Sequence, residues 1–446
     1  MTTVPSAVRR APQDWHVLLG IYFATQIIES YGISQVFAFM PLYLRQLGLP
    51  ESEIPRWVGL LGASVFVLGL PLVPLWGVWA DKYSRKAVII RSAAVEVAVF
   101  AGVALAQTPW QFAVAMLLVG LQLGNTGVML SAIRDVTPRG RLGFAVGVFG
   151  AASGIGFALG PIVGGIIVDG LGLPLQAIYW SSAILTFGIV LLLAFGSREV
   201  RPERIPSGSV IRLAFGAVRG VFTDRATVRL FAIFGVALLA NQMARPFIPI
   251  LVVDLEGSGT GAATGIAVVI GGAALIGALL SPFAGAIGDR IGFRWVLGAA
   301  LAVAAVVMAL LPLAPGVGSL ASGNAVLAGC QAATSAMIFG LLAVEVPAER
   351  RSATLNLVYL PLYLAGIVGP AIGAVVAGAG VGAVFALAAA ILATGALAVG
   401  IGLRRSGAAR PVTDRDASVL PTPVQSAAAI EATVRELEAE NPAELR

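Results

Sequence analysis

Long apolar runs dominate the chain and predict membrane-spanning helices. Twelve such runs occur, at about 17–43, 57–79, 88–107, 109–132, 143–168, 176–196, 230–253, 262–284, 295–313, 318–344, 353–378 and 381–403. A spanning helix needs ~20 mostly apolar residues, because backbone groups cannot stay unpaired in hydrocarbon. A membrane β-barrel would instead show short alternating segments. The pattern therefore predicts an all-α integral membrane protein with twelve transmembrane helices.

The polar gaps between these runs predict four regions. Residues 1–196 would form an N-terminal six-helix bundle and residues 230–405 a C-terminal one. Between them lies a cytoplasmic linker, 197–229, which is weakly amphipathic from Val210 to Val221, and residues 406–446 form a polar cytoplasmic tail. The first apolar run is too long for a signal-peptide core and has no evident cleavage site, so we expect no cleavable signal.

Basic residues mark the cytoplasmic side, because Lys and Arg concentrate in the loops that stay inside. With the N-terminus inside, Lys82, Arg85 and Lys86 fall on the cytoplasmic side, whereas the outer loops carry only Arg45 and Arg56. Both termini are therefore predicted to be cytoplasmic. Abundant alanine, glycine and arginine are typical of GC-rich bacteria, which predicts a multi-pass protein of the inner (cytoplasmic) membrane.

Composition narrows the function further. Hydrophobic residues make up 58% of the 446 positions and charged residues 12%, about half the ~25% of soluble domains. The one cysteine and one histidine exclude a disulfide framework and a Cys/His metal site. No phosphate-binding or dinucleotide motif is present. We expect no enzyme activity, no metal and no cofactor. The net charge of +6 reports membrane orientation, and no nucleic-acid-binding module accompanies it.

The chain also repeats itself at one spacing. Asp81 and Asp289 are 208 positions apart, and Gly160-Pro161 precedes Gly369-Pro370 by 209. Pro138 with Pro347, Arg141 with Arg350, and Gln122 with Gln331 keep the offset of 209. Such a repeat predicts two halves of the same orientation, related by an axis along the membrane normal.

Two motifs resemble those of the major facilitator superfamily. Gly77-x-x-x-Asp81-Lys82-x-Ser84-Arg85-Lys86 resembles its signature between helices two and three. Gly156-x-x-x-Gly160-Pro161-x-x-Gly164-Gly165 resembles the fifth-helix motif of its drug:proton antiporters. The resemblance implies a central cavity lined by helices 1, 4, 7 and 10. These antiporters often carry an arginine early in helix four. This sequence departs from that pattern, since residues 112–122 contain no arginine.

The Asp81 loop predicts a cytoplasmic latch between the two halves. Gly77 would pack closely on a neighbouring helix, and Asp81 would accept hydrogen bonds at the N-terminus of helix eleven near Ser352. Arg85 would pair with Asp135. The latch would consist of Gly77, Asp81, Arg85, Lys86 and Asp135, with Asp289 as the repeat counterpart. The alternative is a basic loop that only fixes topology.

The glycine–proline motifs of helices five and eleven have two interpretations. They comprise Gly156, Gly160, Pro161, Gly164 and Gly165, and Gly369 and Pro370. Small residues four apart allow tight helix contact, and a proline removes one backbone hydrogen bond and bends the helix. The motifs either serve packing alone or also seal the interface against ion leak, which would favour export.

Polar residues inside the predicted spans are functional candidates because they are expensive in a bilayer. Glu29, beside Gln26 and Tyr31, could carry a proton or make only a structural hydrogen bond. Arg245, after Asn241 and Gln242, could bind an anionic group, neutralise an acid, or extend to the outer surface.

Other polar side chains would line the cavity. Gln122, with Asn125 on the same face, and Gln331 would form a polar ring, or else link helices by hydrogen bonds. Asn356, Tyr359 and Tyr363 share a face, where the tyrosines could stack on flat or cationic substrates or lie at the membrane interface.

These observations favour a monomeric secondary transporter that exports small amphipathic compounds in exchange for protons, with the lipid bilayer as its surroundings. A carrier for a sugar, peptide or lipid metabolite is the alternative, and a non-transporting sensor or scaffold is a third hypothesis. Two intact halves argue against the scaffold, and the apolar cavity helices argue against the sugar carrier.

Overall fold

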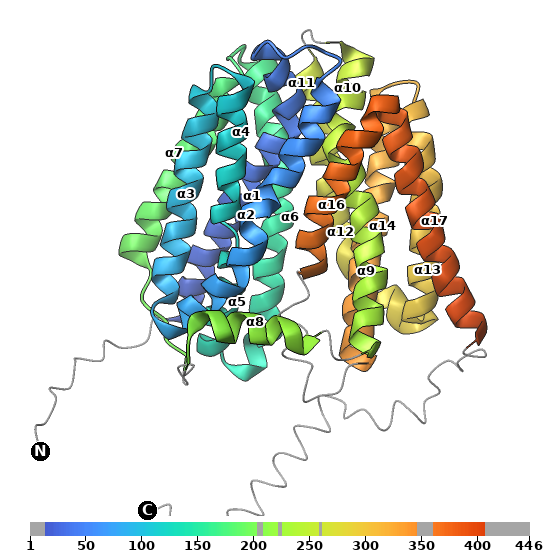
Figure 1. The fold of residues 1–446 in the computed structure, drawn as a ribbon. Coiled ribbons are helices and arrows are strands. Elements are labelled where there is room, and N and C mark those ends of the chain that lie inside the picture. Colours follow the sequence, from blue (N-terminus) through green and yellow to red (C-terminus); the bar gives the residue numbers. More distant parts are fainter. Residues whose placement is uncertain (1–13, 203–207, 222–224, 258–260, 346–359, 406–446) are drawn as a thin grey trace, which may run out of the picture. The chain divides into compact units, whose positions relative to one another are not determined.

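The described part of the molecule is entirely helical. The computed structural model describes residues 14–202, 208–221, 225–257, 261–345 and 360–405, and every regular element within them is a helix (Figure 1). Eleven helices among these residues are long and apolar enough to cross a membrane. The all-α membrane prediction is confirmed.

The N-terminal half follows the predicted spans closely. Its elements are α1 (Trp15–Gln46), α2 (Ile54–Lys82), α3 (Arg85–Leu105), α4 (Pro109–Leu118), η1 (Val119–Leu121), α5 (Asn125–Val136), η2 (Arg139–Arg141), α6 (Leu142–Gly165), η3 (Ile166–Gly170), α7 (Gln176–Leu191) and η4 (Leu192–Gly196).

The C-terminal half begins after a short helix, α8 (Val210–Val221). Its elements are α9 (Arg225–Ala244), η5 (Arg245–Phe247), α10 (Ile248–Glu256), α11 (Ala262–Ile266), η6 (Ala267–Gly271), α12 (Gly272–Ile291), α13 (Phe293–Leu310), η7 (Leu311–Leu313), α14 (Val317–Glu345), α16 (Leu360–Val376), η8 (Ala377–Ala379) and α17 (Val381–Arg405). The tenth predicted span, α14, is a helix of 29 residues but is not one of the eleven candidates, so the count of twelve stays a prediction.

Two spans are interrupted near their middles. The fourth breaks between η1 and α5, where Gly124 has a φ of 104°, a left-handed conformation that favours glycine. The freed carbonyl oxygen of Gln122 accepts a hydrogen bond from Ser92 Oγ at 2.5 Å and one from the Arg91 guanidinium at 3.4 Å. The seventh breaks at η5, where Pro246 cannot donate a backbone hydrogen bond.

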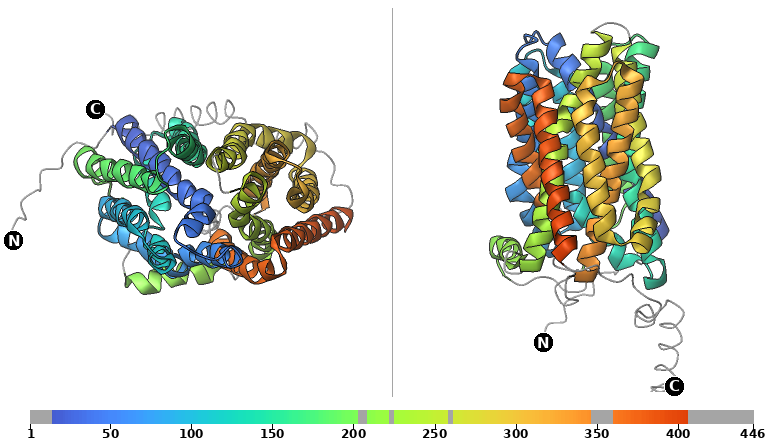
Figure 2. Two further views of the ribbon diagram at one scale, coloured as in Figure 1. Left: turned by 90° about the horizontal axis from the view of Figure 1, so that it is seen from above. Right: turned by 90° about the vertical axis from the view of Figure 1, so that its right-hand side faces the viewer.

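Repeat-related helices pair in the same way in both halves. Helix α6 packs along α1, and α16 packs along α9. The halves meet where α2 contacts α16 and where α6 contacts α12 and η6, and Figure 2 shows α2 beside α16. Residues Met1–Val399 form one compact unit, and the separate unit Gly400–Arg446 is described only at the end of α17.

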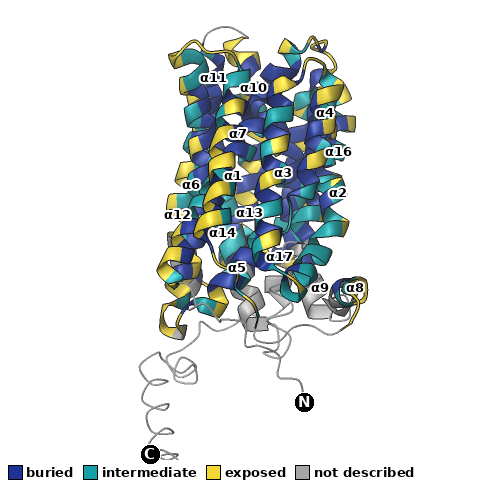
Figure 3. Ribbon diagram, turned by 90° about the vertical axis from the view of Figure 1, so that its left-hand side faces the viewer, coloured by how far each residue is buried: buried dark blue, intermediate teal, exposed yellow. Residues whose placement is uncertain are grey.

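Buried and exposed positions both suit a bilayer. The core of the N-terminal half includes Tyr22, Met129 and Phe149. Large apolar side chains are also exposed on the helix surfaces, among them Ile184 (67%) and Phe195 (86%), and exposed positions recur along the helices in Figure 3. Apolar surface of this extent matches contact with lipid rather than water.

Helix α8 is a surface helix. It occupies the segment predicted to be amphipathic, contacts α2, and runs across the long axes of the other helices in Figure 1. Lys82 at the end of α2 donates a hydrogen bond to the carbonyl oxygen of Gly208 at 2.7 Å, which ties the start of this segment to the N-terminal half.

Candidate functional site

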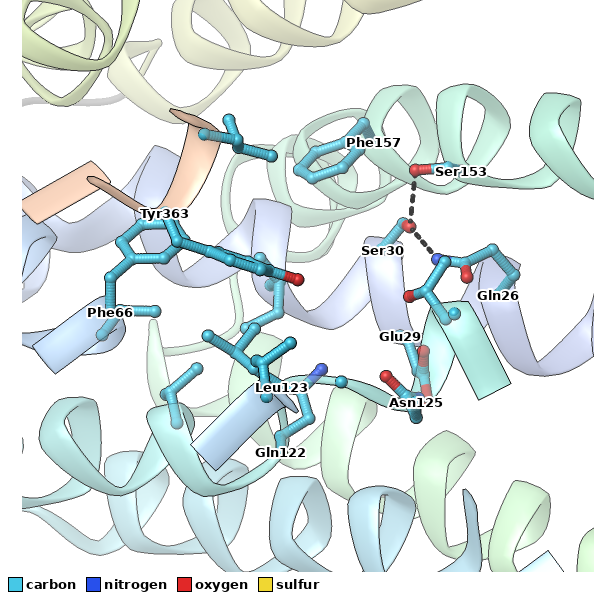
Figure 4. A pocket seen from close by; sticks show the side chains of 18 of the residues that line it. Gln26, Glu29, Ser30, Phe66, Gln122, Leu123, Asn125, Ser153, Phe157 and Tyr363 are labelled. Carbon is cyan, nitrogen blue, oxygen red and sulfur yellow. Dashed lines mark hydrogen bonds between the residues drawn. The ribbon is translucent and has the colours of Figure 1, made fainter. Parts of the chain in front are cut away.

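A cavity of about 550 Å³ lies between the two halves. Helices α1, α2, α5 and α6 line it from the N-terminal half, and α9, η5 and α16 line it from the C-terminal half. Its volume falls within the range of ~300–1,000 Å³ that is common for small-molecule sites. Part of it is drawn in Figure 4.

Polar groups gather on the wall that the N-terminal half provides. Asn125, the first residue after the break in the fourth span, donates a hydrogen bond to Glu29 Oε1. Gln26 Nε2 donates to Ser30 Oγ, which in turn donates to Ser153 Oγ on α6, both at 3.2 Å. Figure 4 shows this chain of side chains, with Glu29 and Asn125 beside each other. The break in the fourth span thus places an amide opposite the buried carboxylate.

Most of the other lining residues are apolar, and some of them are aromatic. Phe66 of α2 and Tyr363 of α16 lie with ring centroids 6.0 Å apart, one from each half (Figure 4). Phe37 of α1 and Phe157 of α6 also line the cavity, both from the N-terminal half. The cavity is therefore amphipathic, with a cluster of polar groups beside aromatic surface.

Arg245 faces the cavity from the C-terminal half. Its guanidinium carbon lies 4.9 Å from the ring centroid of Phe157 and 5.9 Å from that of Phe37. These are cation–π distances. The side chain thus points toward the opposite half, and the predicted alternative of an extension to the outer surface does not apply here.

A second buried carboxyl group lies behind the cavity wall. Glu96 of α3 is 1% exposed, and neither of its oxygens has a hydrogen-bond partner within the described residues. It interacts electrostatically with Glu29. The N-terminal half therefore buries two acids close together, one on the cavity wall and one behind it.

The cavity gathers only some of the predicted polar residues. It is lined by Gln26, Glu29, Gln122, Asn125, Gln242, Arg245 and Tyr363. Tyr31 instead pairs with Ser181 of α7 at 2.9 Å. Asn241 and Gln331 are not among the lining residues, and none of the described residues of α14 lines the cavity. Asn356 and Tyr359 lie outside the described residues.

Sequence reasoning missed the contributions of α2 and α6. Phe66 and Phe157 carry no signal in sequence because they resemble lipid-facing residues. The small polar Ser153, one helical turn before Phe157, was the available indication.

The Asp81 loop forms an ion cluster within the N-terminal half. The buried Arg85 guanidinium donates to Asp81 Oδ1 at 2.8 Å through Nε and to Asp135 Oδ2 at 2.7 Å through an Nη. The predicted pair with Asp135 is present. Asp81 thus contacts Arg85 of its own half, while Ser352, the predicted partner region in helix eleven, lies outside the described residues. Nothing is described of the Asp289 side chain.

An acid that the sequence did not single out caps α3. The Glu199 carboxylate accepts hydrogen bonds from the Ser84 hydroxyl and from the backbone N–H of Arg85, the latter at 2.9 Å. Lys86 Nζ donates to the carbonyl oxygens of Ala194 and Ser197, each at 2.7 Å. A carboxylate stabilises a helix N-terminus and a cation stabilises a C-terminus, so these contacts lock the end of the sixth span to the start of the third.

The expected close packing at Gly77 is wrong for this conformation. A Cβ atom built at Gly77 meets nothing within 4 Å. The physical reason is that Gly77 lies on an open side of α2, whereas Ala80 on the same helix end is buried in the core of the N-terminal half.

The glycine motif of α6 forms a tight contact with α1. A Cβ at Gly156 would lie 2.6 Å from Ser30 Cβ, and one at Gly160 would lie 2.5 Å from the Tyr31 carbonyl oxygen. At Gly164 it would overlap the Phe39 ring. Pro161, between these glycines, is buried in the same interface.

The other glycines of the motif serve related contacts. A Cβ at Gly165 would lie 2.9 Å from Ala267 Cβ of the C-terminal half. In α16, one at Gly369 would lie 2.9 Å from the Leu239 carbonyl oxygen of α9, while Pro370 lines the cavity. The packing interpretation therefore has direct geometric support in both repeats.

One polar contact joins the halves at the opposite end from the Asp81 loop. Asp169 Oδ2 in η3, which continues α6, accepts hydrogen bonds from Thr264 N at 2.7 Å and from Thr264 Oγ1 at 2.8 Å. Thr264 belongs to α11 in the C-terminal half. This outer inter-half contact holds the two halves together beyond the cavity.

A many-spanning helical protein whose two halves enclose a cavity of small-molecule size is a membrane transporter. Matches to known proteins give its family. The family model described as "Major Facilitator Superfamily" matches residues 20–276 and 230–437. The chain belongs to the major facilitator superfamily, a family of transporters rather than enzymes.

Its curated relatives lie in the drug efflux branch. The chain is 29% identical over 410 residues to "Multidrug resistance protein MdtG" of Enterobacter lignolyticus (strain SCF1), covering 91% of this chain and 96% of the relative. It is 30% identical to the protein of the same name from Salmonella arizonae, over 68% of this chain and 74% of the relative.

Solved structures share the fold. The human organic anion transporter MFSD10 (TETRAN) matches with a TM-score of 0.63 and 17% identity, over 87% of this chain and all (100%) of that one. A POT family transporter in complex with a thioalcohol-conjugated peptide matches with a TM-score of 0.69 and 13% identity, over 87% of this chain and 96% of that one.

Proposed function

We propose that this protein exports small amphipathic compounds across a bacterial inner membrane, as a monomer, by alternating access coupled to proton entry. The observation that carries the proposal is the amphipathic cavity of about 550 Å³ lined from both halves. The relatives named as multidrug resistance proteins support export of drug-like compounds. Twelve spans in two six-helix bundles, with both termini cytoplasmic, complete the proposed architecture.

Alternating access is supported by how the halves touch. The glycine contacts of α6 with α1 and of α16 with α9 make each half internally rigid. On the outer side, Thr264 donates two hydrogen bonds to Asp169, beside the close approach of Gly165 to Ala267. Rocking of rigid halves would break such a local contact and open the cavity to the outside.

Proton coupling is assigned to Glu29. This carboxylate is 3% exposed, lies on the cavity wall, and has an amide as its hydrogen-bond partner rather than a cation. A carboxyl group in this position is stable in the protonated form when the cavity is dry. Exposure to water from the outside would exchange its proton, and the halves would respond to the change in charge.

Purified protein in proteoliposomes tests the proposal. We expect the wild type to move fluorescent dyes uphill when a proton gradient is imposed, and Glu29→Gln to lose uphill transport while it keeps dye counterflow without a gradient. Glu256→Gln, at an exposed acid near the outer end, is the matched control and should behave as wild type.

Two results would contradict the proposal. Uphill transport by Glu29→Gln at the wild-type rate would remove Glu29 from coupling. Uptake of a sugar or dipeptide, with no movement of any dye, would replace the exporter by a metabolite carrier.

A further inference from the structure

The cavity holds one cation that its own walls leave uncompensated. Arg245 makes no ion pair with a carboxylate among the described residues, and its guanidinium lies near the rings of Phe157 and Phe37. Aromatic rings attract a guanidinium through its face. Arg245 lines the cavity and is exposed there, and guanidinium N–H groups favour bidentate pairing with planar oxyanions.

The charges of the cavity wall are unevenly placed. Among the described lining residues, Glu29 is the one acid and Arg245 the one base. Glu29 is held by Asn125 on the N-terminal wall, whereas Arg245 is on the C-terminal wall. Gln242 also lines the cavity and lies three residues before Arg245, on the same helical face, where its amide can donate a further hydrogen bond.

We propose that the cavity takes amphipathic organic anions, with the carboxylate, phosphonate or sulfonate of the substrate bound by Arg245. This assignment rests on the exporter function proposed above and names its substrate class. The apolar body of the substrate lies against the aromatic surface of Phe66 and Tyr363. Arg245 is exposed to the cavity and has no carboxylate partner among the described residues, so an anionic ligand supplies one.

The same geometry disfavours lipophilic cations. A cationic head group in the cavity would face an unpaired guanidinium on one wall, and like charges at close range repel strongly where water is scarce. Glu29, the one acid on the wall, is already engaged by Asn125. A pairing of Arg245 with Glu29 in another conformation is the competing explanation, and it predicts no preference for anionic ligands.

Three dansyl probes that differ in charge separate these cases. Dansylglycine is anionic, dansylglycinamide is its neutral amide, and dansylaminoethyl-trimethylammonium is cationic. Binding to the detergent-purified full chain is read as energy transfer from its seven tryptophans. The variants are Arg245→Met, which keeps length without charge, and Arg245→Lys, which keeps charge. Arg56→Met, at an exposed position in the first turn of α2, is the matched control.

We expect the wild type and Arg56→Met to bind dansylglycine about tenfold or more tightly than dansylglycinamide, and the cation most weakly. Arg245→Met should bind the acid and the amide equally, and its retained binding of the amide shows that it is folded. If Arg245→Met binds no probe, the Arg245→Lys variant tests the site instead. A preference of this variant for dansylglycine over dansylglycinamide of about threefold or more supports the anion site, and no preference overturns it.

Other outcomes also count against the anion site. A wild type without preference, or with preference for the cation, overturns it, as does an Arg245→Met variant that keeps the wild-type preference. Efflux of the same probes from proteoliposomes reads the exporter function separately. Efflux without charge preference overturns only the anion site, whereas binding of dansylglycine without efflux of any probe overturns only the exporter function.

Discussion

The contact between α6 and α1 predicts how glycine-to-alanine substitutions in α6, each of which adds one methyl group, change the stability of the protein. At Gly160, a Cβ atom would lie 2.5 Å from the carbonyl oxygen of Tyr31 and 3.3 Å from Gln35 Cγ, and it would overlap the Ser34 hydroxyl. Because one of these atoms is backbone, relief requires α1 or α6 to move. At Gly147, on the same helix, a Cβ atom would meet nothing within 4 Å.

The expected change in stability combines two opposing contributions, the gain from a better helix former and the cost of overpacking. Replacing a helical glycine by alanine stabilises a helix by about 0.5–1 kcal/mol, and Gly147→Ala should show this gain alone. Overpacking typically destabilises by about 1–3 kcal/mol, and the backbone contact at Gly160 places it in the upper part of that range. We therefore expect Gly160→Ala to be less stable than wild type by about 1–2 kcal/mol. Gly160→Leu should be worse still.

The assay is thermal stability of the detergent-purified variants, read as the monodisperse fraction after heating, together with dye efflux in proteoliposomes. Gly147→Ala should melt at or above the wild-type temperature, Gly160→Ala below it, and Gly160→Leu lowest. Equal melting of the two alanine variants would show that the glycine motif of α6 does not make a tight contact.

Four further substitutions probe the polar contacts. Arg85→Gln removes the buried cation from between Asp81 and Asp135. It should destabilise the protein by about 1–3 kcal/mol in a thermal melt and no more, because the two acids left unpaired are only partly buried; an unchanged melting temperature would mean that the cluster is not stabilising. Glu199→Gln weakens the cap of α3 and should lower the stability of the protein by about 0.5–2 kcal/mol in the same melt. An unchanged melting temperature would show that water replaces the carboxylate without penalty. Asp169→Asn should shift the halves about fivefold toward the outward-open state in spin-label distance measurements, a change of about 1 kcal/mol. Thr264→Val removes the hydroxyl but keeps the backbone N–H that donates to Asp169, so it should shift the halves less than Asp169→Asn does. A larger shift than that of Asp169→Asn would refute the outer inter-half contact.

Much of the fold could be predicted from sequence because hydropathy directly measures the property that the membrane selects. The first span, expected at 17–43, is helical over Trp15–Gln46. The repeat offset also predicted that α6 and α16 would use equivalent glycine contacts. The interruption of the fourth span was not predicted, since Gly124 is one of many glycines and its left-handed conformation leaves no hydropathy signal.

The cavity was predicted less completely than the helices. Buried polar residues such as Glu29 and Arg245 stand out in an apolar run, so their placement could be anticipated. Phe66 and Phe157 could not be, because an aromatic residue that faces lipid and one that faces a cavity have the same hydropathy. Helices that are apolar all round carry no periodic signal that tells which face is inward.

The contacts at the cytoplasmic end of the N-terminal half have a consequence for biosynthesis. Arg85 pairs with Asp135, Lys86 with the carbonyl oxygens of Ala194 and Ser197, and Glu199 with the start of α3. All these partners precede α9 in the chain, and chains fold from the N-terminus as they emerge. Helix α16, by contrast, packs on α9 and α2, so it must insert against helices already in the bilayer. Cotranslational assembly therefore divides into an early stage that needs only residues up to Glu199 and a late stage in which α16 joins the two halves.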